Sequence, residues 1–395
     1  MKKKIAFVNQ RYGIEVNGGS EQYTREFAER LLPYYNVEVL TTCALEYIDW
    51  KNFYPEGTQQ INGVAVRRFP VDRPRSIKRF NQLTERLLFH KTATEDEWIN
   101  EQGPLCTKLI QFIKDNQKEY DVFIFVTYLY YLTVRGIGLV KNKSILIPTA
   151  HDEKPIYFEI YKGVFNAPRA IAFNTDEERE LVYSIFRNQH IPSNILGVGA
   201  EPPLHAAPDE FRSKYRLSDY IIYVGRIDDS KGCNELFKYF IQYKESNPSD
   251  LKLVLIGKAV MPIPKHSDII SLGFVSEADK YNGISASRLL ILPSLYESLS
   301  MSVLESLSLG IPVVVNGKSD VLRMHCHKSN AGLYYRNYRE FEGILNYLFN
   351  HPDEYALLSE NGRRYITANY NWPLIIGKLK EMIDSVALNA DPTRQ

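Results

Sequence analysis

Short runs of β-branched and aliphatic residues alternate with segments of helical periodicity, and this alternation constrains the fold more than any other feature of the chain. Strands that alternate with helices pair in parallel, because each helix crosses back to the start of the next strand. The sequence therefore predicts an α/β architecture whose parallel sheets are covered on both faces. One series of runs covers residues 5–8, 37–41, 64–69, 122–126, 145–148 and 170–173, and a second covers 221–224, 251–257, 269–270, 288–293 and 312–315.

The length of 395 residues predicts two domains, since a domain usually has about 150 residues. A turn-rich segment, GAEPP at 199–203, separates the two series of strands. We expect one Rossmann-like domain over residues 1–200 and a second over 201–372, with a C-terminal helix over about 373–395 that packs back on the first. Ligands of doubly wound sheets bind beyond the carboxyl ends of the strands.

Composition excludes several classes of protein. The 48 basic and 47 acidic residues leave a net charge of +1, which excludes a protein whose whole surface binds nucleic acid. The longest apolar stretch, 122–134, is shorter than the roughly 20 residues that cross a bilayer, and no secretory signal is present, so we expect a cytoplasmic protein. Four cysteines without a C-x-x-C pair are expected to be reduced structural thiols: Cys43, Cys106, Cys233 and Cys326.

A glycine-rich segment follows the first predicted strand. Gly18 and Gly19 precede Ser20, which we expect to cap a helix that has Glu21 in its first turn. Glycines let a ligand approach the backbone, and a helix N-terminus favours an anion. The spacing is not G-x-G-x-x-G, so a dinucleotide fingerprint is absent. Contact with a phosphate or sugar and a plain tight turn both remain open.

Two cations follow the first strand of the second series, in the segment YVGRIDDSKG at 223–232. Arg226 and Lys231 lie beside a turn that begins at Gly225, an arrangement suited to a diphosphate. Solvated surface charges are the alternative interpretation.

Two glutamates eight residues apart lie in the segment that begins at Leu292. A helix that starts near Ser300 would offer its free N–H groups to an anion. Glu305 would lie inside that helix, where its carboxylate can accept hydrogen bonds from a ribose diol. Glu297, on the preceding loop, can reach sugar hydroxyls.

These three segments, in this order, resemble the family 4 retaining glycosyltransferases of the GT-B fold, whose E-x7-E motif is matched by Glu297 and Glu305. The resemblance implies two Rossmann-like domains that face each other across a cleft, with a nucleotide-sugar donor held mainly by the second. It implies that Arg226 and Lys231 hold the diphosphate, Glu305 the ribose and Glu297 the transferred sugar. His151 is implied to act near that sugar, and the other implied donor contacts are Gly18, Gly19, Gly225, Gly273, Phe274, Val275, Ser300, Met301 and Ser302.

The segment after Glu297 departs from the family, since many members have glycines and a phenylalanine where this chain has Ser298-Leu299-Ser300-Met301. No DxD motif is present, and the resemblance implies metal-independent transfer from a UDP- or GDP-sugar without a cofactor. The implied acceptor is a saccharide or a lipid-linked glycan, in bacterial surface polysaccharide synthesis. Two alternatives are a GT-B epimerase or hydrolase of nucleotide sugars and a non-catalytic partner that binds them. His151 has an alternative as an ion-paired surface group.

Two other motifs are set aside. Gly317-Lys318-Ser319 looks like the end of a P-loop, but the earlier glycine that a P-loop requires falls on Pro312, which excludes an ATPase of that kind. His325-Cys326-His327 offers three adjacent metal-ligating side chains without a further cluster, so we expect an ordinary loop rather than a metal site.

Residues 67–80 are strongly basic, with six cations facing the single acid Asp72. The stretch from Ile77 to Leu88 has apolar residues at close to helical spacing, which predicts an apolar face flanked by cations. We hypothesise that this segment guides the enzyme to anionic lipid or to a lipid-linked glycan at the inner membrane face. A solvated basic loop and a groove for an acidic soluble acceptor are the alternatives. The six cations are Arg67, Arg68, Arg73, Arg75, Lys78 and Arg79.

Overall fold

A computed structural model describes residues 2–16, 18–90 and 92–390 of the chain. The chain divides into two compact units, the first comprising Met1–Gly197 with Ile376–Gln395 and the second Val198–Ile375. The last helix, α15 (Trp372–Ala390), therefore belongs to unit 1 from Ile376 onward. Residues 391–395 of the expected C-terminal segment lie outside the described residues.

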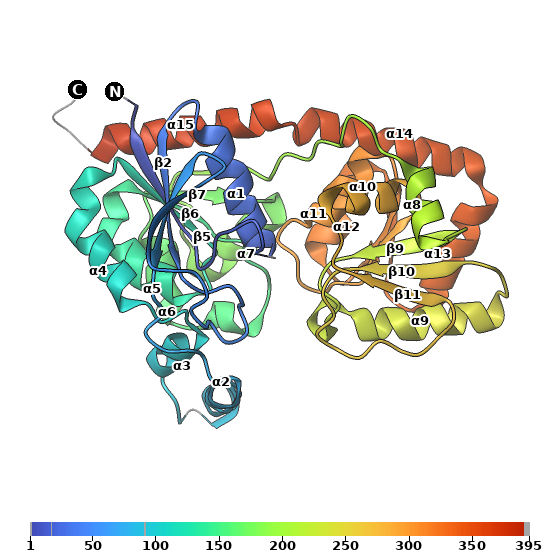
Figure 1. Ribbon diagram of the computed structural model, residues 1–395, viewed down its shortest axis with the longest axis horizontal. Helices are drawn as coiled ribbons and strands as arrows, with labels where there is room; N and C mark the ends of the chain where they lie inside the picture. The colour runs from blue at the N-terminus through green and yellow to red at the C-terminus, as the bar shows by residue number, and fades with distance from the viewer. Residues whose placement is uncertain (1, 17, 91, 391–395) are drawn as a thin grey trace. The chain divides into compact units, whose positions relative to one another are not determined.

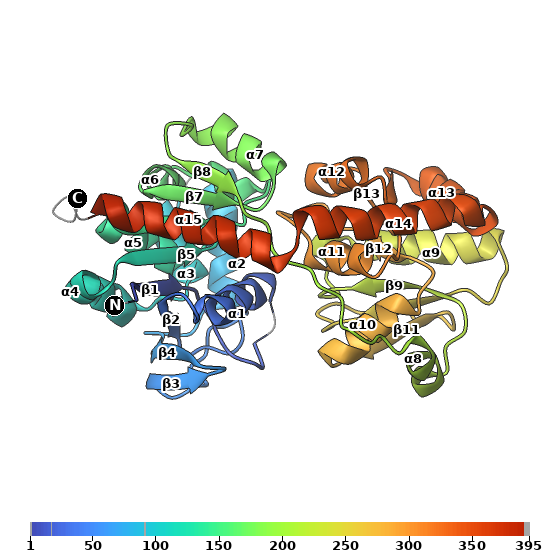
Figure 2. The same ribbon diagram turned by 90° about the horizontal axis from the view of Figure 1, so that it is seen from above.

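Unit 1 is built on a sheet with the strand order β3-β4-β2-β1-β5-β6-β7-β8 (Figures 1 and 2). Its strands pair in parallel, except that β3 runs antiparallel to β4. The six predicted strands of the first series are present, whereas β3 and β8 were not predicted, because β3 is polar and exposed and β8 has three residues. The strands are β1 (Lys4–Val8), β2 (Asn36–Thr42), β3 (Gly57–Ile61), β4 (Val64–Phe69), β5 (Val122–Val126), β6 (Ser144–Ile147), β7 (Ala170–Phe173) and β8 (Ser193–Ile195).

Helices cover both faces of this sheet. In Figure 1, α4 and α5 lie on one side of it and α1 on the other. Every residue of β5 is buried, as expected for a central strand of a covered parallel sheet. The helices of unit 1 are α1 (Gly19–Leu31), α2 (Ile77–Glu85), α3 (Glu95–Gln102), α4 (Thr107–Asn116), α5 (Tyr131–Gly136), α6 (Ile160–Asn166) and α7 (Asp176–Phe186), with shorter turns at Arg86–His90, Gln117–Glu119, Ile137–Lys143 and Lys154–Tyr157.

Unit 2 is built on a parallel sheet with the order β11-β10-β9-β12-β13-β14. The second predicted series of strands is confirmed, whereas β14 was not predicted. Its strands are β9 (Tyr220–Val224), β10 (Lys252–Ile256), β11 (Ile269–Gly273), β12 (Leu290–Leu292), β13 (Val313–Asn316) and β14 (Gly332–Tyr335). Its helices are α8 (Pro208–Tyr215), α9 (Cys233–Ser246), α10 (Glu277–Ser285), α11 (Met301–Ser308), α12 (Asp320–Ser329), α13 (Tyr338–Asn350) and α14 (Pro352–Asn369), with a short turn at Asp229–Lys231.

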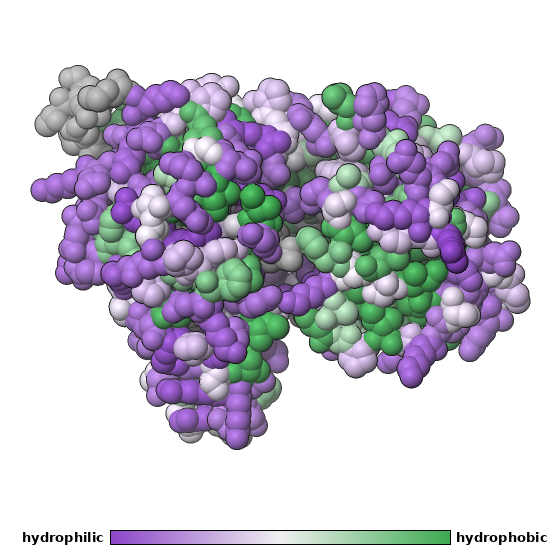
Figure 3. Space-filling model, viewed as in Figure 1, coloured by the Kyte–Doolittle hydropathy of each residue, from purple (hydrophilic) through white to green (hydrophobic). Residues whose placement is uncertain are grey.

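The surface is largely polar on the face seen in Figure 3, with apolar residues gathered over part of unit 2 and in smaller areas on unit 1. No helix in the described part of the chain is long and apolar enough to span a membrane. All four cysteines are free and buried, which confirms that they are structural thiols.

Candidate functional site

The carboxyl ends of β9 and β10 approach each other through glycines. Gly257 has a φ of +140°, and a Cβ atom there would lie 1.9 Å from the carbonyl oxygen of Gly225. Gly225 donates its N–H to the carbonyl of Ile256 at 2.9 Å. Only glycine fits at position 257, because both the backbone conformation and the contact exclude a side chain. The loop that carries Arg226 is therefore fixed to the neighbouring strand.

Arg226 is held by an acidic residue of its own loop. Its Nε atom lies 2.9 Å from Oδ2 of Asp228, whose Oδ1 accepts a hydrogen bond from the Ser230 N–H at 2.8 Å. Burial alone would raise the pKa of Asp228, but the bonds from Ser230 and the charge of Arg226 outweigh it and lower that pKa. The carboxylate is thus ionised and orients the guanidinium at the end of β9.

Lys231 connects the β9 loop to the β12 loop. Its Nζ atom lies 2.7 Å from Oε1 of Glu297, and the Lys231 side chain keeps 32% of its surface exposed. The next residue, Gly232, has a φ of +76°, and a Cβ atom there would lie 2.3 Å from the Pro293 carbonyl oxygen. The sequence predicted Lys231 and Glu297 as site residues, and the structure brings them into direct contact.

The N-terminus of α11 lies just beyond Glu297. Ser300 is its N-cap, with its Oγ accepting from the Val303 N–H at 3.4 Å, which confirms the predicted helix start. Ser300 has a φ of +75°, a left-handed conformation that a residue with a side chain adopts at an energetic cost. Ser302 lies nearby, with its Oγ 3.4 Å from that of Ser300. The first-turn N–H groups, from Met301 onward, are a source of donors for an anion.

His325 supports this loop from α12. Its Nε2 lies 2.8 Å from the carbonyl oxygen of Leu299, and its Nδ1 lies 3.2 Å from the Tyr365 hydroxyl. Burial lowers the pKa of His325 to about 4, so the ring is neutral and Nε2–H donates to the carbonyl. The expectation that His325-Cys326-His327 forms a loop was wrong, because Ser319 caps a helix that includes all three. No cluster of potential metal ligands exists in the described residues.

Glu305 is buried on α11 and has a cationic partner. Nζ of Lys280, on α10, lies 2.7 Å from Oε1 of Glu305 and 2.9 Å from Oε2 of Glu277. Sequence reasoning missed Lys280. Its spacing of three residues from Glu277 indicates a helical ion pair, but it carries no information about Glu305.

The turn after β11 contains the residues predicted to contact a base. Gly273 has a φ of +68°, and nothing lies within 4 Å of the Cβ position there. Its carbonyl accepts from the Gly257 N–H at 2.8 Å, which ties this turn to β10. Phe274 is 69% exposed and Val275 is half-buried. Gly273 ends β11 and Gly225 follows β9, while Ser300 and Glu305 lie in the segment and helix after β12 of the same sheet.

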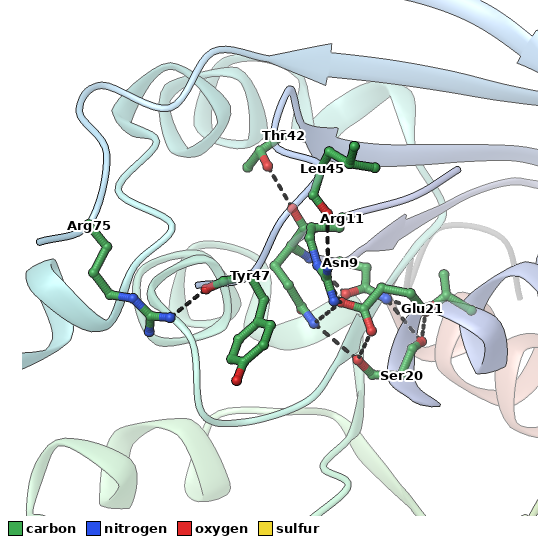
Figure 4. A network of polar contacts seen from close by, with 10 residues as sticks. Asn9, Arg11, Ser20, Glu21, Thr42, Leu45, Tyr47 and Arg75 are labelled. Atoms are coloured by element: carbon green, nitrogen blue, oxygen red, sulfur yellow. Dashed lines mark hydrogen bonds and ion pairs between the residues drawn. The ribbon is translucent and has the colours of Figure 1, made fainter. Parts of the chain in front are cut away.

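In unit 1, a buried ion pair joins Arg11 to Glu21 near the start of α1 (Figure 4). The Arg11 Nη2 atom lies 2.7 Å from Oε1 of Glu21, and Ser20 donates to Oε2 of Glu21 at 2.8 Å. The expected N-cap role of Ser20 was wrong: α1 begins at Gly19 and Gly18 is the residue before it. A Cβ atom at Gly18 would lie 2.1 Å from Oε2 of Glu21, whereas the space beside Gly19 is open. The Glu21 carboxylate therefore leaves no room for a side chain at position 18, and contact of Gly18 and Gly19 with a donor stays a prediction.

His151 follows β6 and is partly exposed. Its Nδ1 lies 3.5 Å from Oε1 of Glu153, which also accepts from the Tyr128 hydroxyl at 2.9 Å. The backbone just before it is held by Glu178, whose carboxyl oxygens accept from the Ala150 N–H and, at 2.6 Å, from the Asn174 N–H. The contact with Glu153 fits the interpretation of His151 as an ion-paired group, and it leaves a role in catalysis untested.

Most cations of residues 67–80 have partners within unit 1. Arg68 is 1% exposed and donates to the Tyr12 carbonyl at 2.6 Å, and Arg75 is 9% exposed and donates to the Ile48 carbonyl at 2.7 Å. Three others pair with buried carboxylates: Arg67 with Glu38 at 2.7 Å, and Arg73 and Arg79 with Glu101 at 2.8 Å and 3.5 Å. The local excess of positive charge therefore serves largely to hold this segment on the unit.

The predicted apolar face of residues 77–88 is also largely used in packing. Leu83 is buried, and Phe80 packs against Trp98 with ring centres 5.7 Å apart. Leu87 and Leu88 pack on the same core, and Ile77 is 41% exposed. The predicted apolar face is thus present, and most of it packs on the core of unit 1.

The family described as "Glycosyl transferases group 1" matches residues 209–365, which include both glutamates and both cations of the site in unit 2. A curated relative, glycosyltransferase 1 domain-containing protein 1 of Xenopus tropicalis, is 24% identical over 168 residues, or 40% of this chain and 47% of that protein. The chain thus spans about half the length of the curated relatives it matches.

Solved structures share the fold over nearly the whole chain. Sucrose-phosphate synthase from Thermosynechococcus elongatus has a TM-score of 0.75 at 15% identity. The match covers 98% of this chain and 99% of that protein chain. HepE of Anabaena, solved in complex with UDP and glucose, has a TM-score of 0.71 at 14% identity, with 97% of this chain covering all of it. These likenesses confirm the predicted α/β fold of the GT-B type.

Proposed function

We propose that this chain is a retaining, metal-independent glycosyltransferase that moves a sugar from a UDP- or GDP-sugar to a saccharide or lipid-linked glycan. The observation that carries the proposal is the 2.7 Å contact between Lys231 and Glu297. It joins a cation suited to a diphosphate with a carboxylate suited to sugar hydroxyls, at the carboxyl ends of adjacent strands, where α/β sheets bind ligands.

The cations provide the chemistry that a metal supplies in other transferases. In the proposed reaction an acceptor hydroxyl oxygen attacks the anomeric carbon on the face from which the leaving group departs. The bond from that carbon to the phosphate oxygen breaks, its electron pair goes to the nucleoside diphosphate, and the acceptor proton passes to that leaving phosphate oxygen. Arg226, Lys231 and the first-turn N–H groups of α11 stabilise the negative charge that develops there.

Donor binding tests the assignment directly. Glu305→Gln and the double change Arg226→Ala with Lys231→Ala should each weaken UDP or GDP binding about ten- to a hundredfold, because charge-assisted hydrogen bonds contribute about 1.5–3 kcal/mol. Lys214→Ala is the matched control, since this lysine pairs with Asp279 at 2.7 Å on an exposed face of unit 2. Calorimetry that finds wild-type affinity in both site variants would remove the assignment.

A donor screen separates transfer from the alternatives. UDP-glucose is the first donor to test, because HepE, which shares the fold, has been solved with it. Release of nucleoside diphosphate that depends on an acceptor, with a product of matching mass, supports the transferase. Release at full rate without acceptor supports a hydrolase or epimerase, and binding without turnover supports a non-catalytic partner. His151→Ala should lower turnover in the same assay if the histidine acts on the sugar.

Association with an anionic membrane through residues 67–80 is the remaining part of the proposal. The exposure of Ile77, Lys78 and Arg79, at the start of α2, supports this part of the proposal. Replacing Lys78 and Arg79 by glutamate should reduce flotation with anionic liposomes, since each cation near such a surface contributes about 1 kcal/mol. Equal flotation of variant and wild type would remove the membrane role and leave the transferase untouched.

A further inference from the structure

Lys280 is a buried lysine whose charged end lies against the carboxylate proposed to bind ribose. The residue is 9% exposed, and its Nζ atom donates to Oε1 of Glu305 at 2.7 Å. It reaches Glu305 across two helices, from the first turn of α10 to the middle of α11. A lysine is seldom buried to this degree unless it is paired.

The lysine is charged in this environment. Burial lowers the pKa of Lys280, but the carboxylates of Glu305 and Glu277 outweigh burial and raise it above its ordinary value. The two carboxylates differ in exposure: the Glu277 side chain is 63% exposed and that of Glu305 is 7% exposed. Glu277 is largely screened by water, so the pair with Glu305 is the one that depends on Lys280.

We propose that Lys280 is a positioning residue that keeps Glu305 ionised and oriented to accept hydrogen bonds from a ribose diol, and that it thereby makes the site selective for ribonucleotides. This inference rests on the proposed function, since it assumes that Glu305 binds the ribose of the donor.

The physical reason lies in the cost of a buried carboxylate. Without Lys280, the buried Glu305 carboxylate would lose the cation that lies 2.7 Å from its Oε1, and burial would disfavour both its charge and its present orientation. A neutral carboxyl group accepts hydrogen bonds more weakly than a carboxylate, and a rotated one no longer points its oxygens at the diol. Recognition of the diol should then fall, while the diphosphate contacts of Arg226 and Lys231 should persist.

The test compares UDP, 2′-deoxy-UDP and inorganic pyrophosphate by calorimetry on the full chain. We expect wild type to bind UDP at least about tenfold more tightly than 2′-deoxy-UDP. Lys280→Met should bring this ratio close to one and leave pyrophosphate affinity within about twofold of wild type. Lys280→Arg, which keeps the charge, should restore most of the ratio. Lys214→Met is the matched control, because Lys214 pairs with the more exposed Asp279 of the same helix, and it should keep the wild-type ratio.

A double variant keeps the test decisive if Lys280→Met fails to fold. Lys280→Met combined with Glu305→Gln removes both charges of the buried pair, so no Glu305 carboxylate remains to lose its contact with Lys280. It should have the same ratio of UDP to 2′-deoxy-UDP affinity as Glu305→Gln alone. A further change in that ratio, a wild-type ratio in Lys280→Met, or an equal loss of pyrophosphate affinity would overturn the inference. Wild-type protein that binds neither UDP nor GDP would instead refute the proposed function.

Discussion

Acid should destabilise unit 2 through His325. The neutral ring is buried between the Leu299 carbonyl and the Tyr365 hydroxyl, and its pKa is lowered from 6.5 to about 4. The unfolded chain takes up a proton below pH 6.5, whereas the folded protein does not until about pH 4. Titration of His325 therefore leaves the free energy of unfolding unchanged above about pH 6.5 and lowers it as the pH falls from 6.5 towards 4. The difference of about 2.5 pKa units corresponds to about 3 kcal/mol, since each unit is worth about 1.4 kcal/mol.

The variant that isolates this effect is His325→Gln, which keeps a side-chain donor for the Leu299 carbonyl but does not titrate. The three tryptophans allow each unit to be followed separately after fluorotryptophan labelling, because Trp50 and Trp98 lie in unit 1 and Trp372 in unit 2. Urea unfolding reported by Trp372 should show wild type losing about 3 kcal/mol more than the variant between pH 7 and pH 4. His327→Gln, an exposed position on the same helix, is the control and should behave as wild type. Parallel pH profiles for wild type and His325→Gln would refute the reasoning.

Three further predictions follow from buried groups and from the charges of the site. Burial raises the pKa of Glu178 from 4.5 to about 8, so unit 1 should lose stability as the pH rises between these values, by up to about 1.4 kcal/mol per pH unit. In Glu178→Gln, the free energy of unfolding reported by Trp50 and Trp98 should depend less on pH, and an unchanged slope would contradict this. Gly257→Ala should lower the free energy of unfolding by more than about 2 kcal/mol, because a Cβ atom there meets the Gly225 carbonyl, whereas Gly343→Ala, with open space around it, should not lower it. Equal melting temperatures of the two variants would contradict this and show that the loop relaxes. Transferase activity should persist in EDTA, and its loss with recovery on adding Mn²⁺ would overturn the metal-independent mechanism.

Several elements of the site could be predicted because their signals are local. Arg226 and Lys231 directly follow a strand, and the eight-residue spacing of Glu297 and Glu305 spans a strand end and a helix start. The start of α11 near Ser300 was predictable from the position of serines after an apolar strand. Such patterns depend on residues within one turn or one strand of each other, so one sequence contains them.

Contacts between distant residues could not be predicted in the same way. Lys280 meets Glu305 across 25 residues, and His325 meets the Leu299 carbonyl across 26, and neither pair has a spacing that distinguishes it from other charged or polar residues. The basic segment shows the same limit, because its charge is visible in the sequence but its partners Glu38 and Glu101 are not.

By itself, the sequence determined the alternation of strands and helices, the two units, and the identity of the charged groups at the strand ends. Periodicity and capping depend on neighbouring residues, so they can be recognised without knowledge of the fold. The tertiary structure alone decided which of those charges are buried, which carboxylate each cation pairs with, and that most of the apolar face of α2 packs inward. Burial and pairing depend on how whole elements pack against one another, and packing is a property of the folded chain rather than of any short segment.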